Sequence, residues 1–244
     1  MKPSKVYFER KMTEKVQERL RQGQTVRLLE LGCGGAKVAA QILASCPGIE
    51  YIGIEPNPVS YASAKKHLEK FRNATVLNGL GYGAVAHEGL SKPFDVVFSL
   101  SVLEHVKDLP AFLAYAAKAA RPGADVAHLY DLGHALYPSN LKERIQVALC
   151  NSPLRRFIPE SKIACYLATE DVQRLLESLQ CHVNEVTFHN MRSLVKLSDA
   201  TQHDPKVLDQ VLAFEETMYG QVPDLKLREK LFPAVCFWTT KQSA

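Results

Sequence analysis

Long hydrophobic runs are missing from this 244-residue sequence, and none approaches the roughly 18–20 residues that a membrane-spanning helix needs. The N-terminus also lacks the apolar core of a secretory signal peptide. The six cysteines are scattered, without the Cys-x-x-Cys spacing of zinc sites. With 13 glycines and 13 prolines, the composition is not that of a fibrous or low-complexity chain. We therefore expect a cytoplasmic globular protein with reduced thiols, no membrane span and no metal site.

The sequence also has little net charge, because 30 Lys and Arg residues against 26 Asp and Glu residues leave an excess of only +4. The first 22 residues hold seven basic and three acidic side chains, which accounts for the whole excess. A nucleic-acid-binding protein usually carries a basic stripe across its body. The sequence therefore disfavours nucleic acid as a partner, and any such contact would have to fall on the N-terminal segment.

That segment has an apolar residue at every fourth position, namely Phe8, Met12, Val16 and Leu20. The spacing predicts an amphipathic helix within residues 1–24, with its charged side chains on the solvent side.

From residue 25 onward, strand-like apolar runs alternate with helical segments. The expected strands span 25–31, 50–55, 75–77, 94–99, 125–130, 183–188 and 234–239. The expected helices between them span 36–45, 58–71, 108–120 and 169–179. This alternation predicts an α/β fold with a doubly wound, mostly parallel sheet. The last two strands lack a clean helical crossover, which indicates an antiparallel finish.

We expect residues 25–244 to form one domain with two cap insertions, at about 133–165 and 197–230. The first is rich in turn formers and predicted to be irregular. Its basic side chains are Lys142, Arg144, Arg155, Arg156 and Lys162. Within it, Leu154-Arg-Arg-Phe157 would either grip an anionic group or form a solvated turn. The second insertion, with helices near 206–219 and 224–230, could cover the site or build a homodimer contact.

A glycine-rich turn follows the first expected strand, at Gly32 and Gly34, and Glu55 ends the second strand. Glycines let the backbone approach a ligand closely, and a carboxylate at the second strand can accept hydrogen bonds from ribose hydroxyls. The pattern predicts a nucleoside-containing cofactor. A nicotinamide dehydrogenase is disfavoured because Lys37 replaces the third glycine of the dinucleotide motif. Glu30 would repel a pyrophosphate but suits an ammonium group.

Three segments resemble successive motifs of the class I S-adenosylmethionine-dependent methyltransferases. They are Val26-Arg-Leu-Leu-Glu-Leu-Gly-Cys-Gly-Gly35, Tyr51-Ile-Gly-Ile-Glu-Pro-Asn57 and Pro93-Phe-Asp-Val-Val-Phe-Ser-Leu-Ser-Val-Leu-Glu-His-Val106. Arg121-Pro-Gly123, before the fifth expected strand, is similar to that family's usual lead-in. The resemblance covers about residues 25–131. It implies a seven-stranded Rossmann-like sheet with an antiparallel last strand, and S-adenosyl-L-methionine as cofactor.

The resemblance also implies roles for individual cofactor-binding residues. Gly32 and Gly34 would pass under the cofactor, with Glu30 near its methionine end and Glu55 on its ribose. Pro56 and Asn57 would border the adenine, and Ser99, Leu100 and Ser101 would lie near the transferred methyl group. The family often has Gly-Asp-Ala after the third strand, whereas this chain has Gly79-Leu80-Gly81. Leu80 thus replaces the acid that binds adenine, and backbone groups or a stacked Tyr82 would have to substitute for it.

The candidate catalytic bases follow the fourth and fifth strands, at the edge where cofactors bind in this fold. They are His105, Tyr130, Asp131 and His134. Asp131 could orient the imidazole of His134 so that it removes a proton from the acceptor. The alternative is that His105 caps a helix or packs beneath the cofactor, and that Asp131 and His134 are solvated loop residues. Glu104 is expected to be structural.

The favoured function is a methyltransferase that acts on a small-molecule acceptor by direct displacement. In that case the N-terminal helix would be a flap over the cofactor, as is common in the family. The alternatives are an RNA or protein methyltransferase that docks through this helix, and a non-catalytic protein that keeps the fold. The fold predicts the cofactor but not the acceptor.

Overall fold

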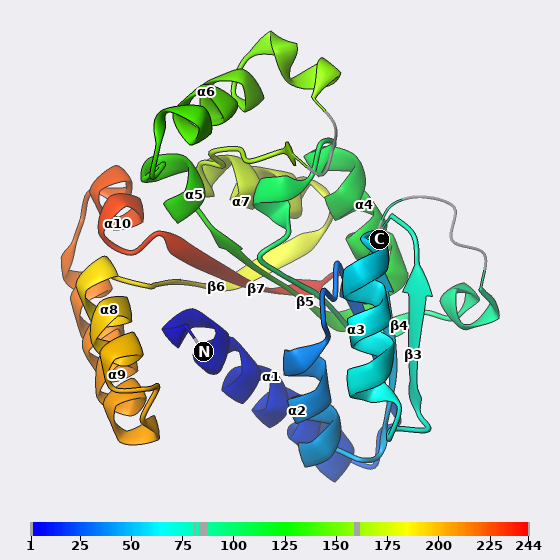
Figure 1. Ribbon diagram of the computed structural model, residues 1–244. Coiled ribbons are helices and arrows are strands. Elements are labelled where there is room, and N and C mark those ends of the chain that lie inside the picture. The colour runs from blue at the N-terminus through cyan, green and yellow to red at the C-terminus, as the bar shows by residue number, and fades with distance from the viewer. Residues whose placement is uncertain (1, 81, 83–86, 159–161, 244) are drawn as a thin grey trace.

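The structure is a computed structural model, which describes residues 2–80, 82, 87–158 and 162–243 (Figure 1). Seven strands form one sheet in the order β3-β2-β1-β4-β5-β7-β6. The strands are β1 (Val26–Leu31), β2 (Ile49–Glu55), β3 (Ala74–Asn78), β4 (Phe94–Leu100), β5 (Ala120–Asp131), β6 (Cys181–His189) and β7 (Ala234–Lys241). Strand β7 runs antiparallel to both of its neighbours, and the other pairings are parallel. This confirms the predicted Rossmann-like sheet with an antiparallel last strand.

Helices cover both faces of the sheet, as Figure 1 shows. They are α1 (Pro3–Arg21), α2 (Lys37–Ser45), α3 (Pro58–Leu68), α4 (Leu109–Ala119), α5 (Gly133–Leu136), α6 (Leu141–Cys150), α7 (Thr169–Ser178), α8 (Arg192–Ala200), α9 (Pro205–Gln221) and α10 (Leu225–Leu231). Short 3₁₀ turns span Glu88–Ser91 (η1), Leu103–His105 (η2) and Pro153–Phe157 (η3). No helix in the described part of the chain is both long and apolar enough to cross a membrane.

Two apolar layers hold the sheet between its helices. Helices α1, α2 and α3 pack on one face, and α4 and α7 pack on the other. Strand β1 lies inside the sheet and is buried on both faces, which is why apolar residues occupy four of its six positions without alternating. Because strands β1 to β5 are parallel, their carboxyl ends lie at one edge of the sheet, where α5 and α6 also lie (Figure 1).

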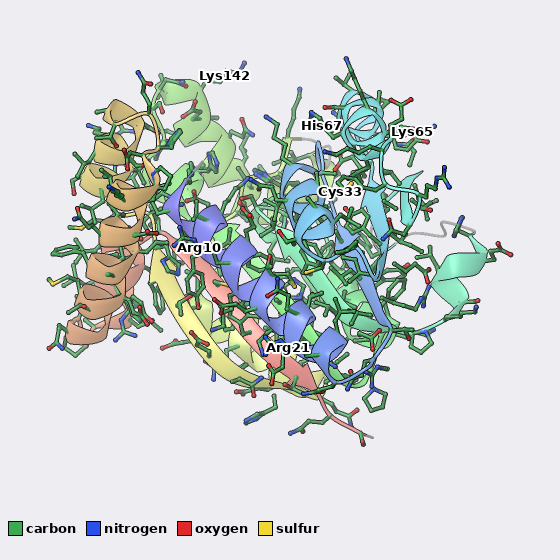
Figure 2. The ribbon with its side chains drawn as sticks, turned by 90° about the horizontal axis from the view of Figure 1, so that it is seen from below. Arg10, Arg21, Cys33, Lys65, His67 and Lys142 are labelled. Carbon is green, nitrogen blue, oxygen red and sulfur yellow. The ribbon has the colours of Figure 1, made fainter. Side chains whose placement is uncertain are left out.

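The N-terminal helix α1 is confirmed, and its apolar stripe is buried except for Leu20, which is half-buried. Phe8, Met12 and Val16 have no exposed surface, and the ring of Phe8 stacks on Trp238 of β7 at a centroid distance of 5.0 Å. Seen from below, α1 crosses the antiparallel end of the sheet, with Arg10 and Arg21 along it (Figure 2). The helix is thus one layer of the core, and its role as a flap stays a prediction.

The basic side chains of α1 are mostly paired rather than solvated. The ion pairs that begin at this helix and its N-cap are Lys2–Asp131, Arg10–Asp209, Lys11–Glu185, Lys15–Asp125 and Arg19–Asp125. The acidic partners come from β5, β6 and α9. The expected solvated basic face is therefore only partly seen: Arg10 and Arg21 are exposed, but most of the basic side chains also pair with acidic residues that are distant in the sequence.

The first insertion is more regular than its composition predicts. Residues 133–157 contain α5, α6 and η3, so the expectation of an irregular cap was wrong. The missed signal is a capping box at the start of α6. The side chain of Asn140 accepts a hydrogen bond from the amide of Glu143, and the Glu143 carboxylate accepts one from the amide of Ser139. The sequence analysis also missed α8, which begins before the expected start of the second insertion.

Candidate active site

The turn after β1 contains two glycines in left-handed conformations, with φ values of +75° at Gly32 and +54° at Gly34. A Cβ atom on Gly32 would lie only 2.7 Å from Cγ2 of Val102, in the loop after β4. A Cβ atom on Gly34 would meet nothing within 4 Å. Gly32 is therefore required by both its backbone angle and a close approach, whereas Gly34 is required by its angle alone.

Glu55 links this turn to the turn after β2. Its Oε2 accepts a hydrogen bond from the amide of Gly34 at 2.7 Å, and its Oε1 accepts one from the amide of Asn57 at 2.9 Å. Each carboxylate oxygen has a second lone pair, so the held carboxylate can still accept hydrogen bonds from two hydroxyl groups. This is the arrangement that a ribose ligand needs.

A cavity of about 390 Å³, the first cleft, opens beside these turns. It is lined by Gly32, Pro56, Asn57, Pro58, Leu80, Tyr82, Val102, His105, Val106 and Phe112. The volume lies in the range of small-molecule sites, and the lining is mostly apolar with a few polar groups, as such sites are. Among the predicted cofactor residues, Gly32, Pro56, Asn57 and Leu80 line it. Gly81, part of the predicted adenine loop, lies outside the described residues.

Several of the predicted cofactor residues are not among those that line the first cleft, namely Glu30, Gly34, Glu55, Ser99, Leu100 and Ser101. Glu30 is only 2% exposed on the face of the sheet that packs against α1 and α2, and it accepts a hydrogen bond from the Tyr51 hydroxyl at 2.6 Å. Burial raises the pKa of Glu30 to about 8. Ser99 is fully buried, with its hydroxyl 2.8 Å from Nδ1 of His128. Leu100 does not line the cleft either.

The physical reason is that side chains within a strand point into the layers above and below the sheet, whereas the ligand edge is formed by the loops. Glu30 and Ser99 still lie inside their strands. Neither residue lines the first cleft, so a direct cofactor contact for Glu30 or Ser99 stays a prediction.

The structure brings two of the predicted bases together. His105 ends η2 and His134 lies in α5, and their ring centroids are 5.9 Å apart. The Nδ1 atom of His105 lies 2.7 Å from the carbonyl oxygen of Ile163, which orients the ring. Burial lowers the pKa of His134, although Asp131 opposes this effect. His134 is therefore a neutral imidazole near pH 7, which is the form that can accept a proton.

Asp131 does not orient His134 as predicted. Its carboxylate instead accepts hydrogen bonds from Nζ of Lys2 at 3.0 Å and from the amide of Gly133 at 2.8 Å. Burial works against ionisation of Asp131, yet the Lys2 ammonium and these hydrogen bonds hold its pKa below the ordinary value. The correction follows from α1, which places a lysine from the other end of the chain beside β5.

Two neighbouring acidic and phenolic groups are structural. Glu104 is 1% exposed, and its Oε1 accepts a hydrogen bond from the amide of Asp131 at 3.1 Å. Burial raises the pKa of Glu104 to about 8. Tyr130 has no exposed surface, and burial raises its pKa. The structure thus gives no role as a base to Tyr130, and Glu104 ties η2 to the end of β5.

A second cleft of about 280 Å³ lies beside His134. It is lined by Lys2, Asp131, Gly133, His134, Tyr137, Asn190, Arg192, Val195, Lys196 and Pro233. Only Asp131 and His134 of this set were candidates from the sequence, because most of the others come from distant segments, near residue 2, at 190–196 and at 233. His105 lines the first cleft and His134 the second, so the histidine pair links the two.

The arginine-containing segment of the first insertion contacts the protein itself. A guanidinium nitrogen of Arg155 donates a hydrogen bond to the carbonyl of Val106, at the rim of the first cleft. The guanidinium of Arg156 lies over the ring of Phe157. Both guanidinium groups of Leu154–Phe157 thus contact the protein itself, and these contacts do not indicate the predicted anion-binding role.

Away from the strand-end edge, a larger hollow of about 550 Å³ lies along α3 and β3. Lys65 lines it, and Figure 2 places that residue on α3, at the outer side of the sheet. It contains no residue of the cofactor motifs, so we do not consider it part of the site. Within the described part of the chain, no cluster of three or more His, Cys, Asp or Glu is placed to hold a metal ion.

Known proteins resemble this chain in part of its sequence and in its fold. Residues 29–126 match the family model described as a methyltransferase domain. A ubiquinone biosynthesis O-methyltransferase from Rhodopseudomonas palustris is 32% identical over 99 residues, which are 40% of this chain and 36% of that protein. A second such enzyme, from Methylobacterium nodulans, is 33% identical over 100 residues, which are 41% of this chain and 39% of that protein. The chain thus spans little more than a third of the curated relatives it matches.

Among solved structures, geranyl diphosphate C-methyltransferase from Streptomyces coelicolor has a TM-score of 0.59 and 10% identity. The match covers 96% of this chain and 79% of that one. At such identity the likeness shows the fold alone. The fold and the strand-end cleft define a Rossmann-like protein. The match over residues 29–126 adds that this part of the chain is similar to a methyltransferase domain, in line with the resemblance of the sequence motifs to the class I S-adenosylmethionine-dependent methyltransferases.

Proposed function

We propose that the protein transfers a methyl group from S-adenosyl-L-methionine to a small-molecule acceptor. The observation that carries the proposal is the carboxylate of Glu55, which accepts hydrogen bonds from the amides of Gly34 and Asn57, and Asn57 lines the first cleft. The cleft beyond it has apolar walls that suit an adenine ring. His105 lines it too, and the His105 ring centroid lies 5.9 Å from that of His134.

Different residues would bind the cofactor and take the proton of the acceptor. Glu55 would accept hydrogen bonds from the ribose hydroxyls, while Pro56 and Leu80 would enclose the adenine. The cofactor supplies an electrophilic methyl group on a sulfonium. The protein then has to orient the acceptor and, for a hydroxyl acceptor, take its proton. His134 is the best-placed proton acceptor because it is neutral and lines the second cleft.

Two observations support a small acceptor over RNA. The basic residues that give α1 its excess charge are mostly engaged in ion pairs with the sheet and α9, which leaves little free positive charge for a phosphate backbone. The second cleft, at about 280 Å³, has room only for a small group. The curated relatives are named O-methyltransferases, which favours an oxygen acceptor.

Calorimetric titration with S-adenosylhomocysteine tests the proposal. We expect binding at one site per chain, weakened in Glu55→Gln. Absence of binding to the wild-type protein would favour the non-catalytic alternative. A [4+2]-cyclase structure also matches 96% of this chain with a TM-score of 0.58 and 14% identity, so the fold by itself does not decide between these alternatives.

A further inference from the structure

The second cleft carries more positive than negative charge. Lys2 and Asp131 form an ion pair and cancel each other. Arg192 and Lys196 lie one helical turn apart on α8, and both line the cleft. Neither has an ion-pair partner in the described part of the chain. The cleft therefore presents two cations that the fold leaves uncompensated.

Arg192 is also held in position by an aromatic ring. Its guanidinium carbon lies 4.7 Å from the ring centroid of Tyr137, which itself lines the cleft. A stacked guanidinium loses less conformational freedom when it binds an anion than a fully mobile one does. Tyr137 thus prepares Arg192 for a ligand in this cleft.

Asn190 supplies an independent sign of a missing ligand. The residue is only 4% exposed, and its Oδ1 accepts a hydrogen bond from the amide of Ser4. Its Nδ2 is buried and has no hydrogen-bond partner among the described residues. Asn190 lines the cleft and has a left-handed backbone with a φ of +66°. A buried donor without an acceptor is costly, so its position beside two cations indicates that a ligand supplies the acceptor.

We propose that the second cleft binds an anionic group of the methyl acceptor, a carboxylate or a phosphate, through Arg192, Lys196 and Nδ2 of Asn190. His134 lines the same cleft, so an acceptor anchored there would extend past this imidazole toward the first cleft. The inference rests on the proposed function, because it names the class of acceptor for the same reaction.

The methionine carboxylate of the cofactor has the same chemistry and must be distinguished from the acceptor. None of the residues of the glycine turn or of the Glu55 turn lines the second cleft. The histidine pair lies at the junction of the two clefts. The geometry therefore favours the acceptor as the source of the anion.

The test uses benzoate and phenyl phosphate as probes, with benzamide as the neutral control of matched shape. Binding is followed by saturation-transfer NMR on the full chain, with and without saturating S-adenosylhomocysteine. We expect at least one of the two anions to bind and benzamide to bind at least about tenfold more weakly, in line with the loss of a charged hydrogen bond. We also expect S-adenosylhomocysteine to leave the binding of the anion intact.

Two variants locate the site. The double substitution Arg192→Gln with Lys196→Gln should weaken the binding of the anion at least about tenfold, whereas Lys226→Gln, an exposed lysine on α10, should leave it unchanged. Asn190→Asp keeps the acceptor for the Ser4 amide and the tolerated backbone angle but removes the donor, so it should also abolish binding while the protein stays folded.

Equal binding of benzoate, phenyl phosphate and benzamide, no binding of either anion, or binding that the α8 variants do not change would each overturn the inference. Displacement of the anion by S-adenosylhomocysteine would assign the cleft to the cofactor instead. Failure of the proposed function is distinguishable, because S-adenosylhomocysteine would then not bind while the anion, measured on the protein alone, still would.

Discussion

The two clefts differ in where their residues come from. The first is lined by the loops after β1, β2, β3 and β4 and by the start of α4, all within residues 32–112. The second draws its residues from position 2 to position 233. If the proposed assignment holds, the cofactor is recognised by short motifs at consecutive strand ends. The acceptor is then recognised by distant segments, which can vary while the cofactor site stays fixed.

The largest expected effect is a loss of turnover on substitution of His134, which lies where the two clefts meet. His134→Ala should lower turnover by roughly 10²-fold or more, the usual contribution of a positioned general base, without changing the affinity for S-adenosylhomocysteine. Because the pKa of His134 is lowered, the rate of the wild-type protein should fall only below the ordinary range of histidine. A radiometric transfer assay on an acceptor found by screening measures the turnover of both proteins and its dependence on pH.

His182→Ala, on the exposed side of β6, is the matched control and should keep full turnover. Full activity in His134→Ala would remove this residue as the base. A parallel loss of affinity for S-adenosylhomocysteine would show that the two clefts are not separate.

The next effect concerns the wall of the first cleft. Gly32→Ala should lower the free energy of unfolding by about 2–5 kcal/mol, because a left-handed backbone and a clash with Val102 add up. Gly123→Ala shares the left-handed angle, with a φ of +77°, but its Cβ would meet nothing within 4 Å. Its cost should stay near 1–2 kcal/mol. Urea denaturation compares the two, and equal losses would contradict the close approach at Gly32.

A smaller effect distinguishes the ligands of the two clefts. Glu55→Gln should weaken the binding of S-adenosylhomocysteine by about 1.5–3 kcal/mol, the range for hydrogen bonds to a charged group, and leave the binding of benzoate unchanged. Titration calorimetry and NMR measure the two affinities. An unchanged affinity for S-adenosylhomocysteine would refute the ribose assignment.

The smallest effect concerns Glu30, which belongs to neither cleft. Its pKa is raised to about 8 by burial, so between pH 4.5 and 8 the folded protein holds a proton that the unfolded chain has lost. Its contribution to stability should therefore fall as the pH rises through this window, by at most about 1.4 kcal/mol per pH unit. Glu30→Gln should reduce the slope in urea denaturation between pH 5.5 and 8. An unchanged slope would show that Glu30 is ionised when folded.

The sequence predicted the sheet and most of the first cleft because both depend on local patterns. Buried strands such as β1 appear as apolar runs, and Gly32 and Glu55 stand at fixed distances from strand ends. The motifs do not tell whether a side chain in a strand faces the cleft or the core. Glu30 and Ser99 both belong to motif segments, yet both are buried in the packed layers.

The second cleft could not be predicted, because its formation depends on tertiary contacts. The pairing of Lys2 with Asp131 requires α1 to lie beside the end of β5, which no local pattern encodes. The left-handed angle at Asn190 and its unpartnered Nδ2 are likewise visible only in the folded chain. By contrast, the capping box at Asn140 and Glu143 was a local signal that was present and overlooked.

A crystal structure with S-adenosylhomocysteine tests the division between the clefts most directly. We expect the adenosine in the first cleft, the ribose hydroxyls on the Glu55 carboxylate, and the second cleft free of the cofactor. Cofactor atoms on Arg192 or Lys196, or a Glu55 carboxylate without a contact to the ribose, would contradict the account.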